Sequence, residues 1–191
     1  GSAITTYTAS SYCASITNES KTNAGTYTVT CNGDSNHNNS TCSFTINKVA
    51  ATLSCSNKNY NGNSQTACSC GDSQSMTGTY AATNASSTAY TAYCTPDSNH
   101  TVNNSTSQVS ATWTMSKANG YVTLSAASGS YTYGGNTSFT ISNSHGGTLS
   151  VDKCTLSGTT VTCSGFNAGS QTVTVTSAAT TNYNAATATY S

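Results

Sequence analysis

The sequence predicts an all-β protein, built of antiparallel β-sandwiches in tandem and stabilised by disulfides. Three features carry this prediction: short segments that alternate hydroxyl and apolar residues, a repeat of about 70 residues, and nine cysteines in a polar chain. Of 191 residues, 33 are Ser and 38 are Thr, with a single Pro and a formal net charge of zero. Because disorder in a chain of low hydrophobicity also requires a high net charge, we expect a folded protein.

The alternating segments are typical of half-buried strands. They lie at 26–30, 41–46 and 172–176, and each places apolar and hydroxyl residues on opposite faces. Thr and Val are β-branched and favour extended backbone, and Gly, Asn and Ser interrupt the runs at short intervals. This pattern predicts antiparallel sandwiches, and no segment shows the periodicity of an amphipathic helix.

An internal repeat sets the predicted domain organisation. The segment 23–48 recurs at 87–100 and again at 167–191, and the closing run 44–48 has a counterpart at 113–117. We therefore expect two whole domains, 48–117 and 118–191. The stretch 1–47 is expected to be an incomplete domain that lacks its first strands.

One predicted hairpin fixes a disulfide in the second domain. Asn61-Gly62 favours a two-residue turn, and counting outward from it places Cys55 opposite Cys68 at a non-hydrogen-bonded position. Such positions bring Cα atoms close enough for a bridge. The sequence therefore predicts a Cys55–Cys68 disulfide.

The same counting applies to the third domain. A turn at Gly158-Thr159 places Cys154 opposite Cys163, again at a non-hydrogen-bonded position. We expect these two cysteines to be bridged.

The remaining cysteines are assigned by strand faces. Cys70 lies on the same face as its neighbour two residues earlier, and we expect it to bridge to Cys94 across the sandwich. Pairing of the strands near 26–31 and 41–46 is expected to place Cys31 opposite Cys42, which predicts a fourth bridge. Cys13 is then the unpaired or intermolecular thiol.

Composition excludes two classes of partner. The chain has five Lys, no Arg and no adjacent Lys pair, so it lacks the basic cluster that a nucleic acid requires. No run approaches 18 apolar residues, so we expect no membrane insertion of this segment. So many cysteines in a weakly apolar chain favour an extracellular location.

The inventory of catalytic groups is short, and we expect no enzymatic activity and no cofactor. His37 and His100 occupy equivalent repeat positions where the third repeat has Tyr183, which favours a turn or packing role for these residues. No nucleophile motif with Gly two residues to either side of Ser is present.

Two kinds of metal site are alternative interpretations of these residues, and the sequence disfavours both. Asp34 with Asn36, and Asp97 with Asn99, have the spacing that begins a calcium loop, but no further acidic ligands follow and bonds to turn amides explain these residues equally well. A zinc site of four thiolates is disfavoured because paired ligands are rarely separated by one residue. Its four candidate ligands are Cys55, Cys68, Cys70 and Cys94.

The segments NAGTYTVTCNGDSNHN, INK, ATLS and the YNG hairpin resemble the tandem bacterial immunoglobulin-like repeats of the Big and MBG type, which occur in large surface proteins. The resemblance covers most of the chain. It departs in the truncated first repeat, the missing Asp of the third and the density of cysteine. It implies elongated immunoglobulin-like sandwiches and no catalytic residues.

The resemblance also implies a function at the cell surface. We expect a stiff structural or adhesive stalk whose partners are other domains of the same surface protein or neighbouring subunits. Two alternatives stay open: a module that binds a glycan or a receptor, and a subunit of an extracellular filament in which a neighbour's strands complete the first domain.

Overall fold

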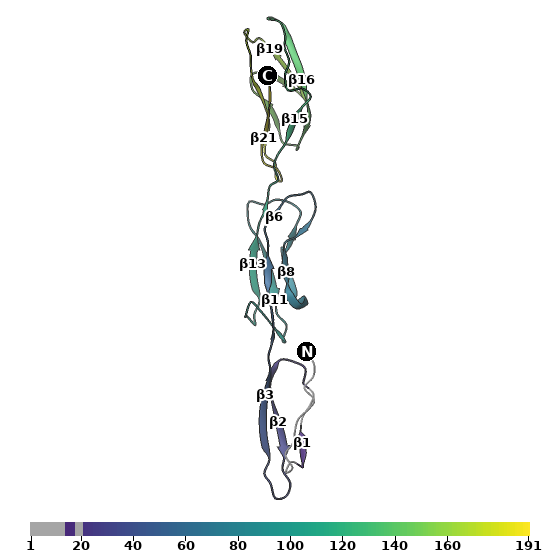
Figure 1. Ribbon diagram of the computed structural model, residues 1–191, viewed down its shortest axis with the longest axis vertical. Coiled ribbons are helices and arrows are strands. Elements are labelled where there is room, and N and C mark those ends of the chain that lie inside the picture. The colour runs from purple at the N-terminus through teal and green to yellow at the C-terminus, as the bar shows by residue number, and fades with distance from the viewer. Residues whose placement is uncertain (1–13, 18–20) are drawn as a thin grey trace. The chain divides into compact units, whose positions relative to one another are not determined.

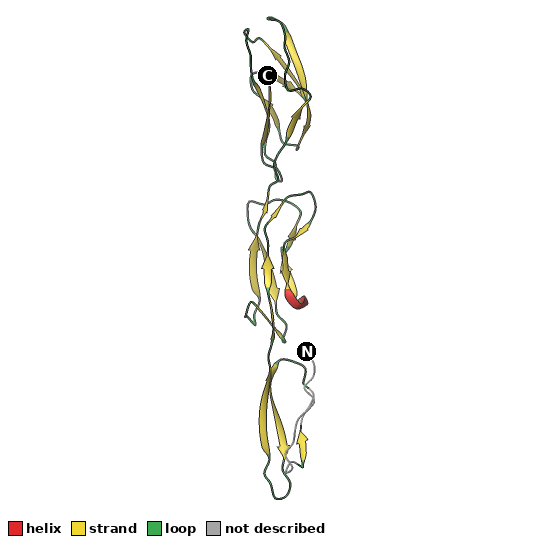
Figure 2. Ribbon diagram, viewed as in Figure 1, coloured by secondary structure: helices red, strands yellow, loops and turns green. Residues whose placement is uncertain are grey.

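The computed structural model describes residues 14–17 and 21–191, which are almost entirely strands, turns and loops (Figures 1 and 2). Within these ranges there is no α-helix, and a single 3-10 turn, Gly71–Ser73, is the one helical element. The predicted all-β class is confirmed. The chain divides into two compact units: unit 1 holds the described residues up to Cys55 with 68–80 and 91–112, and unit 2 holds 56–67, 81–90 and 113–191.

Unit 1 contains a three-stranded antiparallel sheet in the order β1-β2-β3, a second in the order β13-β11-β9, the antiparallel pair β5-β8 and the parallel pair β12-β4. Tyr90, the first residue of β11, and Trp113, the last residue of β13, belong to unit 2. The strands of these sheets are β1 Ser15–Thr17, β2 Gly25–Asn32, β3 Ser40–Ile46, β4 Val49–Ala51, β5 Leu53–Cys55, β8 Cys68–Cys70, β9 Ser75–Gly78, β11 Tyr90–Thr95, β12 His100–Val102 and β13 Val109–Trp113.

The predicted alternation is visible in β2 and β3. Val29 is buried on one face of the sheet, and the rings of Tyr27 and Phe44 lie 5.5 Å apart. On the other face the hydroxyls of Thr26 and Thr45 are 3.1 Å apart. The two faces therefore have the apolar and polar character that the sequence predicts.

The predicted register of β2 against β3 is wrong by two residues. Cys31 is opposite Ser40, and Cys42 is opposite Val29. A shift of two residues leaves every side chain on its original face, so alternation cannot detect it. The turn at Asp34, where its carbonyl accepts a hydrogen bond from the His37 N–H, determines the register instead.

This shift removes the predicted Cys31–Cys42 bridge. Cys42 is a free, exposed thiol, whereas Cys31 takes part in a disulfide that does not include Cys42. The two residues are not opposite each other in the ladder, and a bridge requires close Cα atoms and converging Cβ vectors. The predictions for Cys13 and for the strands missing before it lie outside the described residues.

The other two predicted bridges of unit 1 are present. Cys55 is opposite Cys68 in the β5-β8 pair, and the two form a disulfide. Cys70 is bonded to Cys94, which joins β8 to β11. Cys68 and Cys94 are buried, so these sulfurs are part of the unit's core.

Unit 2 contains two larger antiparallel sheets, β15-β16-β19-β18 and β17-β20-β21, together with the pairs β10-β7 and β14-β6, the latter parallel. Its strands are β6 Lys58–Asn59, β7 Gln65–Thr66, β10 Ala81–Ala82, β14 Met115–Ser116, β15 Val122–Leu124, β16 Asn136–Ser144, β17 Leu149–Val151, β18 Thr155–Ser157, β19 Thr160–Ser164, β20 Val173–Ser177 and β21 Ala186–Tyr190.

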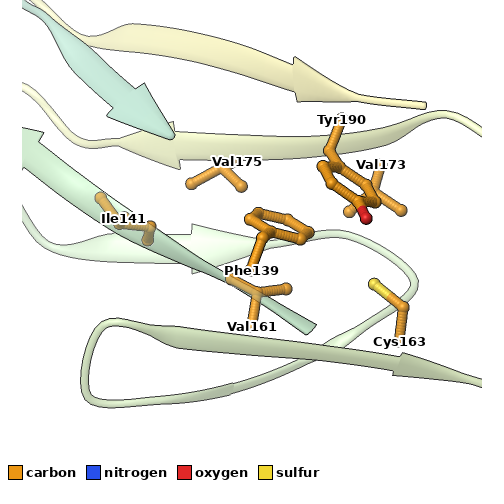
Figure 3. Packing of buried hydrophobic residues seen from close by; sticks show 7 residues of the cluster. All are labelled: Phe139, Ile141, Val161, Cys163, Val173, Val175 and Tyr190. Atoms are coloured by element: carbon orange, nitrogen blue, oxygen red, sulfur yellow. The ribbon is translucent and has the colours of Figure 1, made fainter. Parts of the chain in front are cut away.

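The two larger sheets share one core, in which side chains from both layers point toward one another (Figure 3). Phe139 of β16 stacks on Tyr190 of β21 with ring centroids 4.1 Å apart. Val161 and Val175 are fully buried between the layers. Trp113 is also buried in unit 2 and lies 4.8 Å from the ring of Tyr90.

The hairpin β18-β19 has the predicted two-residue turn. Ser157 is opposite Thr160, and Gly158 adopts a φ of +60°, which favours glycine. Cys154 and Cys163 form the expected disulfide one position beyond this ladder. The turn therefore determined the cysteine pairing, as the sequence predicts.

The predicted two-residue turn at Asn61-Gly62 is not formed, although Cys55 and Cys68 pair in the register that it predicts. The cross-strand backbone hydrogen bond nearest to Asn61-Gly62 joins the Ser56 N–H to the Ala67 carbonyl. Beyond it the strands separate, because β6 pairs with β14 and β7 pairs with β10.

The Cys55–Cys68, Cys70–Cys94 and Cys154–Cys163 disulfides indicate an oxidising, extracellular environment. Among the residues described, no helix is long and apolar enough to cross a membrane.

Candidate functional site

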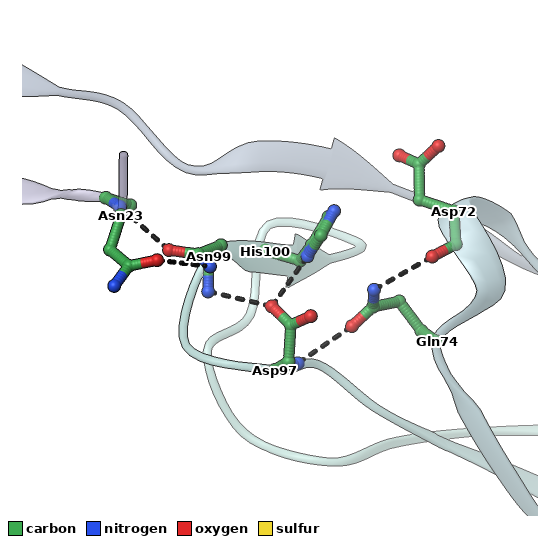
Figure 4. A network of polar contacts seen from close by, with 7 residues as sticks. Asn23, Asp72, Gln74, Asp97, Asn99 and His100 are labelled. Atoms are coloured by element: carbon green, nitrogen blue, oxygen red, sulfur yellow. Dashed lines mark hydrogen bonds and ion pairs between the residues drawn. The ribbon is translucent and has the colours of Figure 1, made fainter. Parts of the chain in front are cut away.

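A tight turn at 97–100 presents the side chain of Asn99. Asp97 Oδ1 accepts a hydrogen bond from the Asn99 N–H at 2.7 Å and contacts His100 Nδ1 at 2.6 Å (Figure 4). The Asp97 N–H donates to Gln74 Oε1 at 2.7 Å. The contact with His100, followed by the bond from the Asn99 N–H, holds the pKa of Asp97 below its usual value.

Asn99 joins two distant segments of unit 1 in an arrangement that we call the Asn99 clasp, formed by Asn23, Ala24, Val49 and Asn99. Its Oδ1 accepts a hydrogen bond from the Ala24 N–H at 2.8 Å, and its Nδ2 donates to Asn23 Oδ1 at 3.1 Å. Its carbonyl accepts from the Val49 N–H at 2.9 Å. Asn99 therefore accepts hydrogen bonds from two backbone N–H groups, one before β3 in the sequence and one after it.

Unit 2 contains the same arrangement, the Asn182 clasp, formed by Asn84, Ala85, Ala118 and Asn182. Asn182 Oδ1 accepts from the Ala85 N–H at 2.9 Å, and its Nδ2 donates to Asn84 Oδ1 at 3.1 Å. Its carbonyl accepts from the Ala118 N–H at 2.9 Å. All three bonds have the same donors and acceptors as in the Asn99 clasp.

A tyrosine fixes the Asn-Ala segment in each clasp. The Tyr27 hydroxyl donates to the Asn23 carbonyl at 2.8 Å, and the Tyr90 hydroxyl donates to the Asn84 carbonyl at 2.9 Å. Each ring also contacts an aromatic ring of the adjacent strand, Phe44 for Tyr27 and Trp113 for Tyr90. The receiving segment is therefore held in place by its own strand pair, independently of the turn that docks on it.

The turns of the two clasps differ in chemistry. In unit 2, Thr180 takes the place of Asp97, and its hydroxyl accepts from the Tyr183 N–H at 3.1 Å. The Tyr183 ring lies edge-on to Tyr60 at 5.3 Å and to Tyr121 at 5.9 Å. Aromatic packing thus replaces the carboxylate–imidazole contact of the other turn.

His145 has a structural role in unit 2. It is 8% exposed, its Nδ1 accepts from the Tyr121 N–H at 3.0 Å, and its Nε2 donates to the Ala178 carbonyl at 2.8 Å. Its ring also lies 5.4 Å from that of Tyr183. Both nitrogens bind backbone groups, as is usual for a buried imidazole.

The third copy of the turn, at 34–37, has the same internal bonds. Asp34 Oδ1 accepts from the Asn36 N–H at 2.8 Å and contacts His37 Nδ1 at 2.6 Å. These two contacts, the first of them the larger, hold the pKa of Asp34 below its usual value. The calcium alternative loses support here, because the same carboxylate oxygen already binds the Asn36 N–H and His37 Nδ1 within the turn.

The zinc alternative is wrong. The four candidate thiolates are consumed by the Cys55–Cys68 and Cys70–Cys94 disulfides, and a disulfide sulfur is not a thiolate ligand. Among residues 14–17 and 21–191, no three His, Cys, Asp or Glu side chains are grouped so that they could hold a metal ion.

The repeats in the sequence identify the turns, but they did not reveal the Asn-Ala segments that these turns bind. The predicted repeat match to 23–48 begins at residue 87, beyond Asn84, which is the structural counterpart of Asn23. The signal that could have found the receiving segments is the dipeptide Asn-Ala, which stands before the paired strand in all three repeats.

No protein-family model matches this chain, and no curated protein matches it.

Proposed function

We propose that this chain is a non-catalytic structural segment of an extracellular or cell-surface protein, in which immunoglobulin-like repeats stack end to end into a stiff stalk. The repeats of this proposal are 1–47, 48–117 and 118–191. The observation that carries it is the recurrence of one clasp, with the same three hydrogen bonds, at two places that correspond in the repeats.

The clasps support stiffness because they join the end of one repeat to a turn of the next. In the Asn99 clasp, the turn residue binds the segment before β2 and the first residue of β4 at the same time. The linker between β3 and β4 is only Asn47 and Lys48, which leaves little slack. A bidentate asparagine and a short linker together restrict rotation at such a joint.

In the Asn182 clasp, Lys117 adds a further contact, because its Nζ donates to the Thr180 carbonyl at 2.5 Å. The lysine that closes a repeat therefore binds the turn of the repeat that follows. We infer that the closing residues of each repeat serve as part of the joint.

Small-angle X-ray scattering of the wild-type chain and of an Asn99→Ala, Asn182→Ala variant tests this function. A stalk predicts a large maximum dimension for the wild type and a broader, shorter distance distribution for the variant. Matching substitutions at the exposed Asn38 and Asn143 are the control and leave the distribution unchanged. A compact wild-type particle contradicts the proposal.

A second candidate function is binding of a carbohydrate. A pocket of about 650 Å³ in unit 2 is lined by Tyr131, Tyr133 and Phe166, with Asn167 and Gln171 as amide side chains. Tyr133 is 78% exposed, and aromatic faces beside amides suit a sugar. A glycan array probed with the wild type and Tyr133→Ala separates this candidate from the first, since a purely structural segment gives no signal that depends on Tyr133.

A further inference from the structure

Each clasp pairs a turn with an Asn-Ala dipeptide. One turn and one such dipeptide take part in neither clasp. The turn half is an asparagine at the third position of the turn, and the receiving half is an Asn-Ala dipeptide. The chain has three such turns and three Asn-Ala dipeptides that precede β2, β11 and β20, but the described residues form two clasps. The turn 34–37 and the dipeptide Asn167-Ala168 remain outside them.

The turn 34–37 has the conformation that docks elsewhere in the molecule. The bond from the Asn36 N–H to Asp34 Oδ1 measures 2.8 Å, and the equivalent bond from the Asn99 N–H to Asp97 Oδ1 measures 2.7 Å. Asn36 is exposed, and its side chain forms no hydrogen bond with any residue of the described ranges. The backbone of this turn therefore already has the conformation found in the Asn99 clasp.

The dipeptide Asn167-Ala168 is the matching surface. It precedes Val173 of β20 by the same spacing that separates Asn23-Ala24 from Val29 of β2. Within the described part of the chain, neither the Ala168 N–H nor the Asn167 side chain has a hydrogen-bond partner, and both residues are exposed. In the Asn182 clasp the equivalent Ala85 is only 6% exposed.

A second observation marks the same surface as unfilled. Tyr133 corresponds in the repeat to Tyr60, whose ring is half-buried against that of Tyr183 in the Asn182 clasp. Tyr133 is instead 78% exposed, and it borders the pocket of about 650 Å³ that also includes Asn167 and Ala168. The hydroxyl of Tyr131 in the same pocket is buried and has no hydrogen-bond partner among the described residues.

We propose that Asn167-Ala168 and the adjoining tyrosines bind the turn 34–37 of a second copy of this chain. In this contact Asn36 Oδ1 accepts from the Ala168 N–H, Asn36 Nδ2 donates to Asn167 Oδ1, and the ring of His37 packs on Tyr133. The proposal rests on the proposed stacking function and extends it from repeats within one chain to separate copies. Because the two surfaces differ, the contact is heterologous and adds copies in an open series.

Sedimentation velocity over a concentration series up to the millimolar range tests this. The wild type shows a weight-average sedimentation coefficient that rises with concentration. Asn36→Ala weakens the association about tenfold or more, because two hydrogen bonds are lost. It leaves the turn folded, because Asp34 Oδ1 holds the backbone and not the side chain of residue 36. Asn38→Ala, at an exposed neighbour, associates like the wild type.

Mixing two variants identifies the polarity of the contact. Asn36→Ala keeps the receiving surface, and Tyr133→Ala keeps the turn, so each alone associates weakly. Their mixture forms one wild-type contact and therefore stops at dimers. In the ¹⁵N-labelled Asn36→Ala chain, the Ala168 amide signal shifts when unlabelled Tyr133→Ala chain is added.

Any of the following outcomes overturns the proposal: no association of the wild type at millimolar concentration, equal association of Asn36→Ala and the wild type, or a mixture that behaves like its components. A glycan that shifts the Ala168 signal while Asn36 has no effect also overturns it. Scattering from dilute, monomeric chain still tests the stalk itself, so failure of this contact and failure of the proposed function are distinguishable.

Discussion

Unit 1 and unit 2 stabilise similar β-structure by different means. The largest buried apolar side chain described in unit 1 is Leu53, whereas unit 2 buries Trp113, Met115, Phe139 and Tyr190. Unit 1 contains the Cys55–Cys68 and Cys70–Cys94 bridges, and unit 2 contains Cys154–Cys163. The difference indicates that cross-links supplement packing where the core is made of aliphatic side chains and Cys, because such side chains bury less area than the rings of unit 2.

We expect the largest loss of stability from a substitution in the core of unit 2. Phe139→Ala removes a ring that is 4% exposed and stacked on Tyr190, and it should lower the free energy of unfolding of unit 2 by about 3 to 5 kcal/mol. Fluorescence of Trp113, the single tryptophan, measures this in urea. The matched change in unit 1, Val102→Ala, should cost about 2 kcal/mol by hydrogen exchange. Equal costs would contradict the comparison.

The next effect concerns the bridges. Cys70→Ala with Cys94→Ala opens a loop of 24 residues and should destabilise unit 1 by about 3.5 kcal/mol. Cys154→Ala with Cys163→Ala opens a loop of 9 residues and should cost unit 2 about 2.5 kcal/mol. Urea unfolding followed by hydrogen exchange in each unit measures both. A larger loss in unit 2 would show that cross-links matter more where the core is large.

Substitutions in the two clasps should lower stability less, and Asn182→Ala should lower it more than Asn99→Ala. Asn182→Ala leaves the Ala85 N–H without its acceptor at a residue that is 6% exposed, and should cost about 1 to 3 kcal/mol. Asn99→Ala should cost less, since Ala24 is only partly buried and water can replace the lost bond. Hydrogen exchange of the Ala24 and Ala85 amides reports each clasp separately. The reverse order would contradict this account of burial.

The smallest effect is a difference in acid sensitivity. The pKa of Asp97 is lowered in the folded state, so its contribution is present above the usual Asp value and is lost as the pH falls through the lower folded value, below about pH 4. Protection of the Ala24 amide should therefore decrease in acid. Protection of the Ala85 amide should not, because its turn carries Thr180.

Asp97→Asn serves as the control for this effect, since it removes the titrating group and should abolish the acid dependence at Ala24. Acid sensitivity of Ala85 equal to that of Ala24 would show that the turn carboxylate is not its cause.

The sequence predicted cysteine pairing well where a short turn sets the register. Gly158 fixes which residues face each other, so Cys154–Cys163 could be counted from the turn. Counting from Asn61-Gly62 also gave Cys55–Cys68, although the strands separate between that position and the bridge. The longer loop between β2 and β3 allowed two registers that differ by two residues. Alternation is identical in both, and for that reason the Cys31–Cys42 prediction failed.

The clasps lay beyond sequence reasoning for a different reason. Their bonds join Ala24 to Asn99 and Ala85 to Asn182, which are 75 and 97 residues apart. The repeats identified Asn99 and Asn182 as equivalent turn positions, but nothing local reveals what a turn side chain will contact. Asn and Asp in such turns usually bond to their own backbone, and Asp97 does so while Asn99 does not.

The sequence by itself determined the β class, the faces of the strands and the bridges beside tight turns, because each depends on period two or on a few neighbouring residues. Only the tertiary structure decided the register across the longer loop, the separation of β6 from β7, and the docking of Asn99 and Asn182. Those features depend on which distant backbone groups lack a partner, and that is known only when the strands have been placed in space.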